Sequence, residues 1–434
     1  MNNANKFIAV LGLMLSMNVA HVQAVERSSY SLNDLYKLAL NHNPDLEHSQ
    51  LQIQKAHAKL GEAHSSQRPK VTLQSEISQA WMRNNDFSRT ANQLQMTYPI
   101  YNPSLESNRV ISELNLKSQD YRNEALHQAM FKQLGNAYYE YWKAEAQWQF
   151  LEKERLFLIE TMRQLKQRMK VGYQGLDEVL ELKARLANLD SKRIAAQSMM
   201  TLQLNQIEQI VGKSLKTSML VMPERSNQLN TQPLTMVEIA SAIRQHPLMQ
   251  SLDLQKQAQQ KTIEKVKHKD GLEVELFGIV TNNDSDGRFF DDMRGTRAGV
   301  RLSWPLYLGG ATDYRTQQAQ VETMQLQSRI SSQKLMLQTQ IKNALLEVQT
   351  LQQRIKAERK NYQAQKAVLN ATKQAIYTGK KSVIDLLDVQ RKLNRVERDL
   401  SLLNTDLEIQ NIHLKWALGH LNLSSTELPH YSSD

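Results

Sequence analysis

A run of about 110 residues, 311–421, constrains the fold most, because it holds no proline and only two glycines, Gly379 and Gly419. Gln, Leu, Lys, Arg, Glu and Ala dominate it, and all of them favour helices. We predict two helices, 311–378 and 383–420, because Gly379 suits a helix C-cap and Ser382 suits an N-cap. The first would be about 100 Å long. That length is typical of a coiled coil, and the run is too polar for a membrane span.

The same layout occurs twice in the chain. Residues 105–212 also form a long helical run, a glycine-containing break at 171–175 and a shorter run. Gly172 and Gly379 lie 207 positions apart, and Pro99 and Pro305 lie 206 apart. Such paired positions keep one order along the sequence, which indicates a tandem duplication of about 205 residues.

Segments of alternating polarity precede each helical hairpin. Apolar and polar residues alternate in 70–81 and 92–100, and again in 272–276 and 297–304, with polar loops expected at 83–90 and 281–295. We predict β-hairpins at 70–101 and 271–307, with Pro99 and Pro305 at the strand-to-helix turns. Strands of about 9–12 residues are long enough to cross a bilayer when tilted, although a half-buried hairpin of a soluble protein alternates in the same way.

If these strands lie in a membrane, several chains must contribute strands to one closed barrel. Four strands cannot close a barrel, and an open sheet edge is not tolerated in lipid. Two chains would supply eight strands and three would supply twelve, and counting alone does not choose between them.

The N-terminus indicates export from the cytoplasm. Lys6 precedes an apolar stretch, 7–20, that is too short to span a membrane, and residues 22–24 resemble a cleavage site. The chain has no cysteine, which excludes disulfides and cysteine-ligated metal sites. The net charge of +10 comes from Lys and Arg interleaved with acidic residues along helices, so we expect solvated helix faces and no nucleic-acid partner.

These observations divide the chain into four parts. Residues 1–24 form the signal peptide, and 25–230 form the first repeat, with its β-hairpin at 70–101 and its helical hairpin at 104–213. Residues 231–421 form the second repeat, with its β-hairpin at 271–307 and its helical hairpin at 311–420. Residues 422–434 form a C-terminal tail. The expected fold is mainly α: long antiparallel coiled-coil hairpins plus four β-strands per chain, in a tandem repeat.

Three segments carry a family resemblance: Ser303–Gly310, Tyr377–Asp388 and Lys415–Asn422. Together with the duplicated order of helix pair, β-hairpin and helical hairpin, they make the chain resemble TolC-type outer-membrane efflux and secretion channels over nearly all of its mature length. The resemblance implies a fold class that is mainly α with a β-barrel part made of four transmembrane strands per chain. It further implies a homotrimer that forms a twelve-stranded barrel in outer-membrane lipid and a periplasmic tunnel of twelve helices. It also implies a passive exit duct in a Gram-negative bacterium, serving a tripartite efflux pump or type I protein secretion. The implied partners are a periplasmic adaptor and an inner-membrane transporter of ABC or RND type.

The resemblance assigns roles to the glycine breaks. Asp385 and Asp388 fall where the family has an acidic constriction at the periplasmic entrance, although acidic residues in a first helical turn also favour the helix dipole. The matching acidic residues of the first repeat are Glu178 and Glu181. The adaptor would meet the tips, and the residues concerned are Gly172, Gly379, Lys380, Lys381, Glu178 and Glu181. Ile376 stands where a tyrosine is usual in the family, so the sequence does not predict a latch between tips.

No motif predicts catalysis, a metal site or a cofactor. The sequence contains no nucleotide-binding loop and no Ser/His/Asp arrangement with local context, so we expect no enzyme. The aromatic run at 138–142 is interpreted as helix packing. The alternative function is a periplasmic coiled-coil adaptor or scaffold that never enters lipid, whose β-hairpins would have to pack on a protein core.

Overall fold

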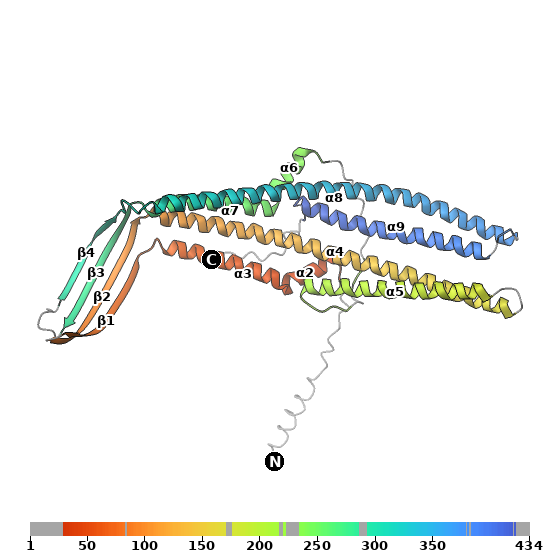
Figure 1. Cartoon of the computed structure of the whole chain (residues 1–434), viewed down its shortest axis with the longest axis horizontal. Coiled ribbons are helices and arrows are strands. Elements are labelled where there is room, and N and C mark those ends of the chain that lie inside the picture. The colour runs from red at the N-terminus through yellow and green to blue at the C-terminus, as the bar shows by residue number, and fades with distance from the viewer. Residues whose placement is uncertain are drawn as a thin grey trace, which may run out of the picture.

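The computed structural model of the chain is elongated, with a four-stranded sheet at one end and two helical hairpins reaching the other (Figure 1). It describes residues 29–82, 85–170, 176–216, 220–222, 234–285, 293–378, 380–381, 383–419 and 421. The expected signal peptide, the tail 422–434, and Gly172, Gly379 and Ser382 lie outside these residues. The fold is mainly helical and duplicated, which confirms the expected fold class.

The elements of the second repeat follow the order of the first. The first repeat contains α2 (Leu32–His42), α3 (Pro44–Ser65), β1 (Lys70–Met82), β2 (Asn85–Tyr101), α4 (Pro103–Lys170) and α5 (Leu176–Val211). The second contains α6 (Met236–Gln245), α7 (Pro247–Lys269), β3 (Glu273–Ser285), β4 (Met293–Ser303), α8 (Ala311–Tyr377) and α9 (Val383–Ala417).

Each helical hairpin is an antiparallel coiled coil with a heptad seam. In the first hairpin, Leu151, Leu158 and Leu165 of α4 pack against the buried residues Leu182, Leu189 and Ala196 of α5. All six follow a spacing of seven residues, which keeps an apolar seam facing the partner helix. Two clusters hold α8 and α9 together, one between the middle of α8 and the C-terminal half of α9 and one near their tip.

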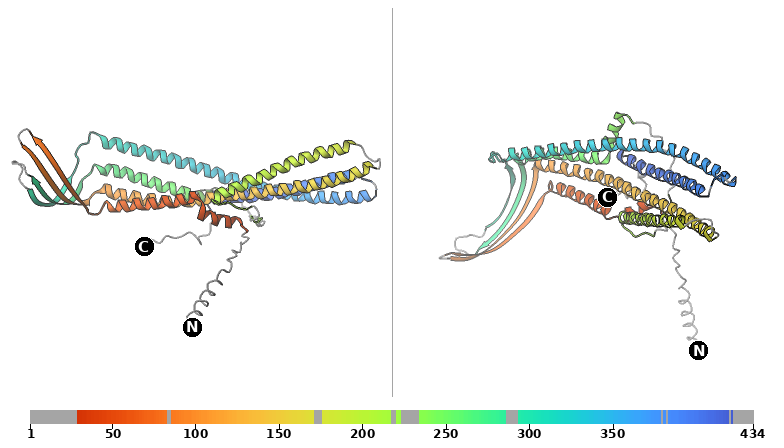
Figure 2. Two further views of the ribbon diagram at one scale, coloured as in Figure 1. Left: turned by 90° about the horizontal axis from the view of Figure 1, so that it is seen from below. Right: turned by 45° about the vertical axis from the view of Figure 1, so that its right-hand side comes forward.

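Helices and strands follow one lateral order. The strands are ordered β1-β2-β3-β4, and every neighbouring pair is antiparallel. Among the helices, α3 and α5 flank α4, α4 also contacts α7 and α9, and both of these contact α8 (Figures 1 and 2). The orders agree because α3 leads into β1, β2 into α4, α7 into β3 and β4 into α8. Within one chain the layer is open at both edges.

Short helices meet end to end beside the long ones at two joints. In the first joint Asn43 caps α3: its Oδ1 accepts hydrogen bonds from the N–H groups of Asp45 and Leu46, and its Nδ2 donates to the Ile210 carbonyl near the end of α5, at 2.6 Å. Gly212, with φ +74°, ends α5 there, and a Cβ at this position would lie 2.2 Å from the carbonyl oxygen of His42. Only glycine fits this close approach with a left-handed backbone.

The second joint repeats this arrangement 207 positions later. Gly419, with φ +71°, follows α9, and a Cβ there would lie 3.3 Å from Cα of His246. His246 caps α7: its Nδ1 accepts a hydrogen bond from the Leu248 N–H at 3.2 Å. A histidine therefore occupies the capping position that Asn43 holds in the first repeat.

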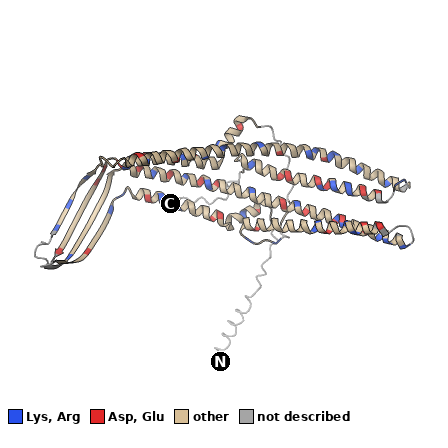
Figure 3. Cartoon of the chain, in the orientation of Figure 1, with Lys and Arg blue, Asp and Glu red and all other residues tan. Residues whose placement is uncertain are grey.

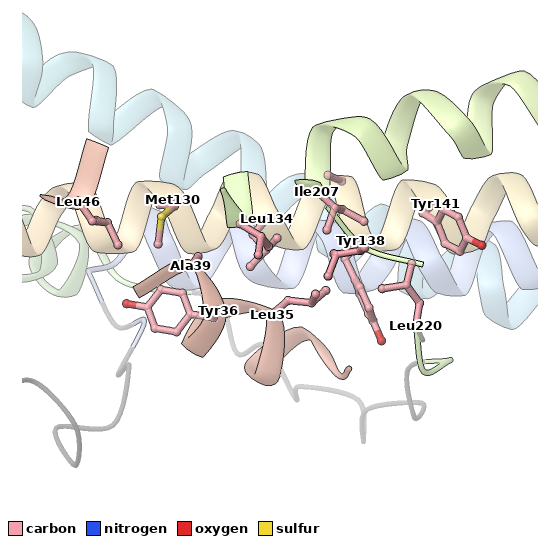
Figure 4. Packing of buried hydrophobic residues seen from close by; sticks show 13 residues of the cluster. Leu35, Tyr36, Ala39, Leu46, Met130, Leu134, Tyr138, Tyr141, Ile207 and Leu220 are labelled. Atoms are coloured by element: carbon pink, nitrogen blue, oxygen red, sulfur yellow. The ribbon is translucent and has the colours of Figure 1, made fainter. Parts of the chain in front are cut away.

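The main apolar core lies beside the first joint, where α2 packs on α4 and α5 (Figure 4). Tyr138 is 1% exposed, stacks edge-to-face with Trp142 and donates a hydrogen bond to the Val221 carbonyl. Tyr36 meets Phe131 in the same edge-to-face geometry. The interpretation of residues 138–142 as helix packing is therefore confirmed.

The strands are longer than the sequence suggested. The expected loop at 83–90 is wrong for most of its length, because β2 begins at Asn85 and its backbone pairs in register with β1. Likewise β3 continues to Ser285, inside the expected loop at 281–295. Polar residues in these segments are compatible with strand pairing, since ladder hydrogen bonds involve only the backbone.

One of the two expected turn prolines lies elsewhere. Pro99 is inside β2, opposite Glu275, at a register shift between Pro99 and Tyr101. A proline has no N–H to donate, so it suits an irregularity of the ladder. The strand-to-helix turn is instead at Asn102, whose side chain accepts hydrogen bonds from the backbone N–H groups of Ser104 and Leu105. Pro305 lies in the segment 304–310 between β4 and α8.

Candidate functional site

The tip of the second hairpin holds the predicted entrance residues. Helix α8 ends at Tyr377, and the N–H of Lys380 donates to the Ala375 carbonyl at 2.9 Å, which closes the last turn. Lys380 and Lys381 are exposed, and α9 begins directly after them at Val383. Gly379, the expected tip glycine, lies between Thr378 and Lys380, outside the described residues.

Asp385 and Asp388 lie in the first turns of α9. Their spacing of three residues places them on one face of the helix. Asp385 is exposed, whereas Asp388 is half-buried and forms an ion pair with Arg391 at 3.2 Å. The structure thus brings the two carboxylates together at the tip, although one of them has a cationic neighbour on its own helix.

The first hairpin carries the corresponding acidic pair 207 positions earlier. Glu178 and Glu181 belong to the first two turns of α5. Glu181 is exposed and paired with Arg185, and the side chain of Glu178 is outside the described residues. Gly172, the expected tip glycine of this hairpin, is outside them as well.

One side of α9 turns toward α4. Asp406 of α9 forms an ion pair with Lys143 of α4 at 2.7 Å, and His413 is 2.8 Å from Oδ1 of Asn136. Arg398 lies over the Phe150 ring at 5.1 Å. Asp385 precedes Asp406 by three heptads, so it lies on this same side of the coiled-coil helix. These contacts fix the orientation of the acidic residues relative to the helical layer.

The sheet has one apolar face that protein does not cover. Val71, Leu73 and Ile77 of β1 are 64%, 72% and 82% exposed. Their strand neighbours continue the exposed face across the sheet: Leu94, Met96, Tyr98, Leu276, Val280, Val300 and Leu302. The opposite face carries polar residues such as Thr72, Gln95 and Arg297. An exposed apolar surface of this kind marks contact with lipid or with another protein.

A groove of about 530 Å³ lies beside the first joint, between α3, α4 and α5. Its lining mixes apolar side chains such as Leu126 and Met130 with amide side chains such as Gln133, Gln203 and Gln206. It offers no nucleophile with an adjacent base. Within the described part of the chain, no cluster of His, Asp or Glu could hold a metal ion. No helix of the described residues is long and apolar enough to cross a membrane.

Comparison with known proteins decides the family. A model of outer membrane efflux proteins matches residues 35–213 and 239–420, which together make up most of the chain. The chain belongs to the outer membrane efflux protein family. The family model matches twice, once in each repeat, as the duplication requires.

Relatives and solved structures agree with this assignment. The chain is 20% identical to outer membrane protein TolC of Vibrio cholerae, over 90% of this chain and 91% of that protein. It is also 20% identical to TolC of Escherichia coli, over 95% and 87%. The crystal structure of the Campylobacter jejuni CmeC outer membrane channel is similar with a TM-score of 0.76 and 16% identity, covering 90% and 85% of the two chains.

The chain is therefore an outer-membrane exit duct of an efflux or secretion system, with a long periplasmic part. This family consists of channels rather than enzymes. Its members are trimeric and work with adaptor and inner-membrane pump partners. The match to outer membrane efflux proteins argues against the alternative of a periplasmic adaptor that never enters lipid.

Sequence reasoning missed the two joints. Gly212 and Gly419 are separated by the same 207 positions as the tip glycines. The signal was present in the sequence, because each glycine follows the last residue of a helical run. What the sequence did not show is that these helix ends meet Asn43 and His246, some 170 residues away along the chain.

Proposed function

We propose that three copies of this chain join through their open edges into one tube. In each copy β1 and β4 are the outer strands, α3 and α5 form one edge of the helical layer, and α8 forms the other. Edge strands carry unpaired backbone groups that lipid cannot satisfy, and pairing β4 of one copy with β1 of the next removes every edge. Three copies follow the trimeric state of the family.

In this assembly the uncovered apolar face of the sheet contacts outer-membrane lipid, and the polar face lines the pore. Strands of 13, 17, 13 and 11 residues are long enough for tilted strands that cross a bilayer of about 30 Å. The single observation that carries the proposal is the shared lateral order of strands and helices, because one set of neighbours then closes both layers together.

Asp385 and Asp388 form the entrance gate in this proposal. Helix α9 contacts α8 through its buried seam and α4 through the side that holds Asp406 and His413. In this proposal α9 turns toward the lumen the side that also contacts α4, on which Asp385 shares a heptad row with Asp406 and His413. Three copies place six carboxylates around the mouth, and such a ring favours cations.

The tips of the helical hairpins are the proposed contact with the periplasmic partners. A periplasmic adaptor meets the hairpin turns around Gly172 and Gly379, and an inner-membrane transporter of ABC or RND type supplies energy and selects the cargo. The cargo is either small toxic molecules or an unfolded protein. Lys380 and Lys381 lie beside the second turn and contribute to the adaptor contact.

Planar-bilayer recording of the protein extracted from outer membranes tests the gate. We expect a small cation-selective conductance in the wild type, and weaker selectivity with a larger conductance in Asp385→Asn/Asp388→Asn. Glu397→Gln, which removes a carboxylate from the other side of α9, is the control and should match the wild type. Unchanged ion selectivity in the double variant would refute the proposed gate but not the proposed channel. Absence of conductance from folded protein would refute the duct itself.

A further inference from the structure

The distal half of α8 is strongly basic on its surface. Between residues 351 and 381 the chain has one acidic residue, Glu358, and eight basic ones: Arg354, Lys356, Arg359, Lys360, Lys366, Lys373, Lys380 and Lys381. All eight are exposed, and none has a carboxylate of the described residues within 4.0 Å. Blue segments predominate along this part of α8 in Figure 3.

Three of these residues form a regular stripe. Arg359, Lys366 and Lys373 are separated by seven residues each. The seam of α8 is set by buried positions such as Ile355, Leu369 and Thr372. Relative to that seam, the three cations occupy one flanking row of the coiled coil, and Lys356 lies next to the row. The stripe from Lys356 to Lys373 is about 26 Å long.

Beyond Arg354, the other flank of the same helix segment is free of charge. Positions 357, 361, 364, 368, 371 and 375 hold Ala, Asn, Ala, Val, Ala and Ala. The two sides of the wall therefore differ in chemistry over this length: one side is cationic, and the other is small and neutral.

The cationic flank lies opposite the acidic pair. Arg359 directly follows a seam position of α8, whereas Asp385 directly precedes the seam residue Leu386 of α9. In an antiparallel pair of helices, a residue that follows the seam and one that precedes it lie on opposite sides of the pair. If Asp385 faces the lumen, as the proposed function states, the basic stripe faces the outside of the tube.

The fold does not require this stripe. The equivalent positions of the first repeat, 207 residues earlier, hold Glu152, Ile159 and Lys166. Residues 144–174, the equivalent segment of α4, carry six basic and four acidic residues. Several of the acidic residues are paired, as in Arg155–Glu152 and Arg163–Glu160. The same coiled coil is thus built without the stripe, which indicates a role in recognition rather than in folding.

We propose that the stripe Lys356–Arg359–Lys366–Lys373 is a docking surface for an acidic helix of a periplasmic partner. The occupant is a coiled-coil helix with Asp or Glu at every seventh position, since that spacing matches the three cations. The inference rests on the proposed function for the outward direction of the stripe. It distinguishes the two hairpins: the α8/α9 hairpin binds the acidic partner helix, and the α4/α5 hairpin does not offer the same row.

The test measures binding of a synthetic probe to the full-length protein purified in detergent. The probe is a fluorescein-labelled antiparallel coiled-coil hairpin with glutamate at its exposed heptad positions, and a second probe has glutamine there. The variant is Arg359→Gln/Lys366→Gln/Lys373→Gln. The matched control is Lys153→Gln/Lys166→Gln/Lys183→Gln on the first hairpin, which removes three exposed positive charges without touching the stripe.

We expect the glutamate probe to bind the wild type and the control alike, and about tenfold more weakly to the variant, because three surface ion pairs contribute about 0.5 kcal/mol each. Added salt should weaken only the glutamate probe. Equal binding to variant and control, or equal binding of both probes, would overturn the inference. Dissociation of the variant into single chains would assign the stripe to the contact between copies instead. Bilayer conductance of the same samples reports the duct separately.

Discussion

The second joint predicts a local sensitivity to acid that the first joint lacks. The His246 side chain belongs to a residue that is 1% exposed, lies edge-to-face with Trp416 at 5.9 Å, and accepts the Leu248 N–H through Nδ1. Burial lowers the pKa of His246 to about 4, against a smaller opposing effect of the Trp416 backbone. Protonation would convert Nδ1 from an acceptor into a donor and would remove the cap of α7.

The magnitude follows from the two pKa values. A histidine titrates near 6.5 when unfolded and near 4 in this fold. Because the folded pKa is depressed, the opened state binds more protons in acid, so the joint is fully stable above pH 6.5 and loses stability as the pH falls from 6.5 toward 4. At pH 5 the loss is about 2 kcal/mol, and the limit below pH 4 is about 3.4 kcal/mol.

Hydrogen exchange of the peptide that spans the start of α7 measures this loss. Between pH 7.5 and pH 5, after correction for intrinsic exchange rates, its protection should fall about 30-fold. The control is His246→Asn, which installs the residue found at position 43 and retains a good N-cap without a titrating group. Its protection should not depend on pH in this way, and neither should that of the peptide around Asn43. Equal pH dependence in wild type and variant would refute the reasoning.

Two further predictions concern the packing of the helices. Gly212→Ala should lower the free energy of unfolding by about 3 kcal/mol or more. Gly309→Ala should lower it by only about 1–2 kcal/mol, because Gly309 has φ +64° but nothing lies within 4 Å of a Cβ there. Thermal unfolding of both variants measures the difference, and equal losses would contradict the close approach at the joint. Ser118 of α4 and Ser251 of α7 are buried, and each hydroxyl donates to the other's carbonyl, at 3.0 and 2.9 Å. A double-mutant cycle of Ser118→Ala and Ser251→Ala should therefore give a coupling of about 0.5 kcal/mol or more, and strict additivity would argue against a shared bond network.

The sequence was informative wherever a local rule decided the structure. The proline-free run predicted α8 and α9, because a heptad seam and good helix formers need no distant partner to be recognised. The sheet was harder, since Asn85–Thr90 is polar and its strand character comes from pairing with β1 rather than from its own pattern. Pro99 was misplaced for a related reason: a proline at a strand end and one at a ladder irregularity look the same in sequence.

The entrance residues show the limit most clearly. Their spacing placed Asp385 and Asp388 on one helix face, but their direction depends on α4, which lies more than 200 residues earlier in the chain. Contacts with α4, among them those of Asp406 and His413, orient α9, and neither residue carries a motif. The ring of carboxylates stays a prediction, because it requires copies of the chain that a single sequence does not describe.

Comparison of the two repeats separates what the architecture needs from what the second half has added. Positions that hold the helices together are retained: Gly212 and Gly419 end helices with the same left-handed backbone, and Asn43 and His246 cap the next helix at the same joint. The acidic pairs at the tips are retained in charge as well. The flanking row of α8 is not retained, since Glu152 and Ile159 stand where Arg359 and Lys366 do. The seam beside this row has changed as well, since Leu151, Leu158 and Leu165 stand where Glu358, Gln365 and Thr372 do. A coiled coil forms in both repeats, so the cationic row is not what holds the hairpin together, and this is the physical reason to look for the partner of the channel on that side.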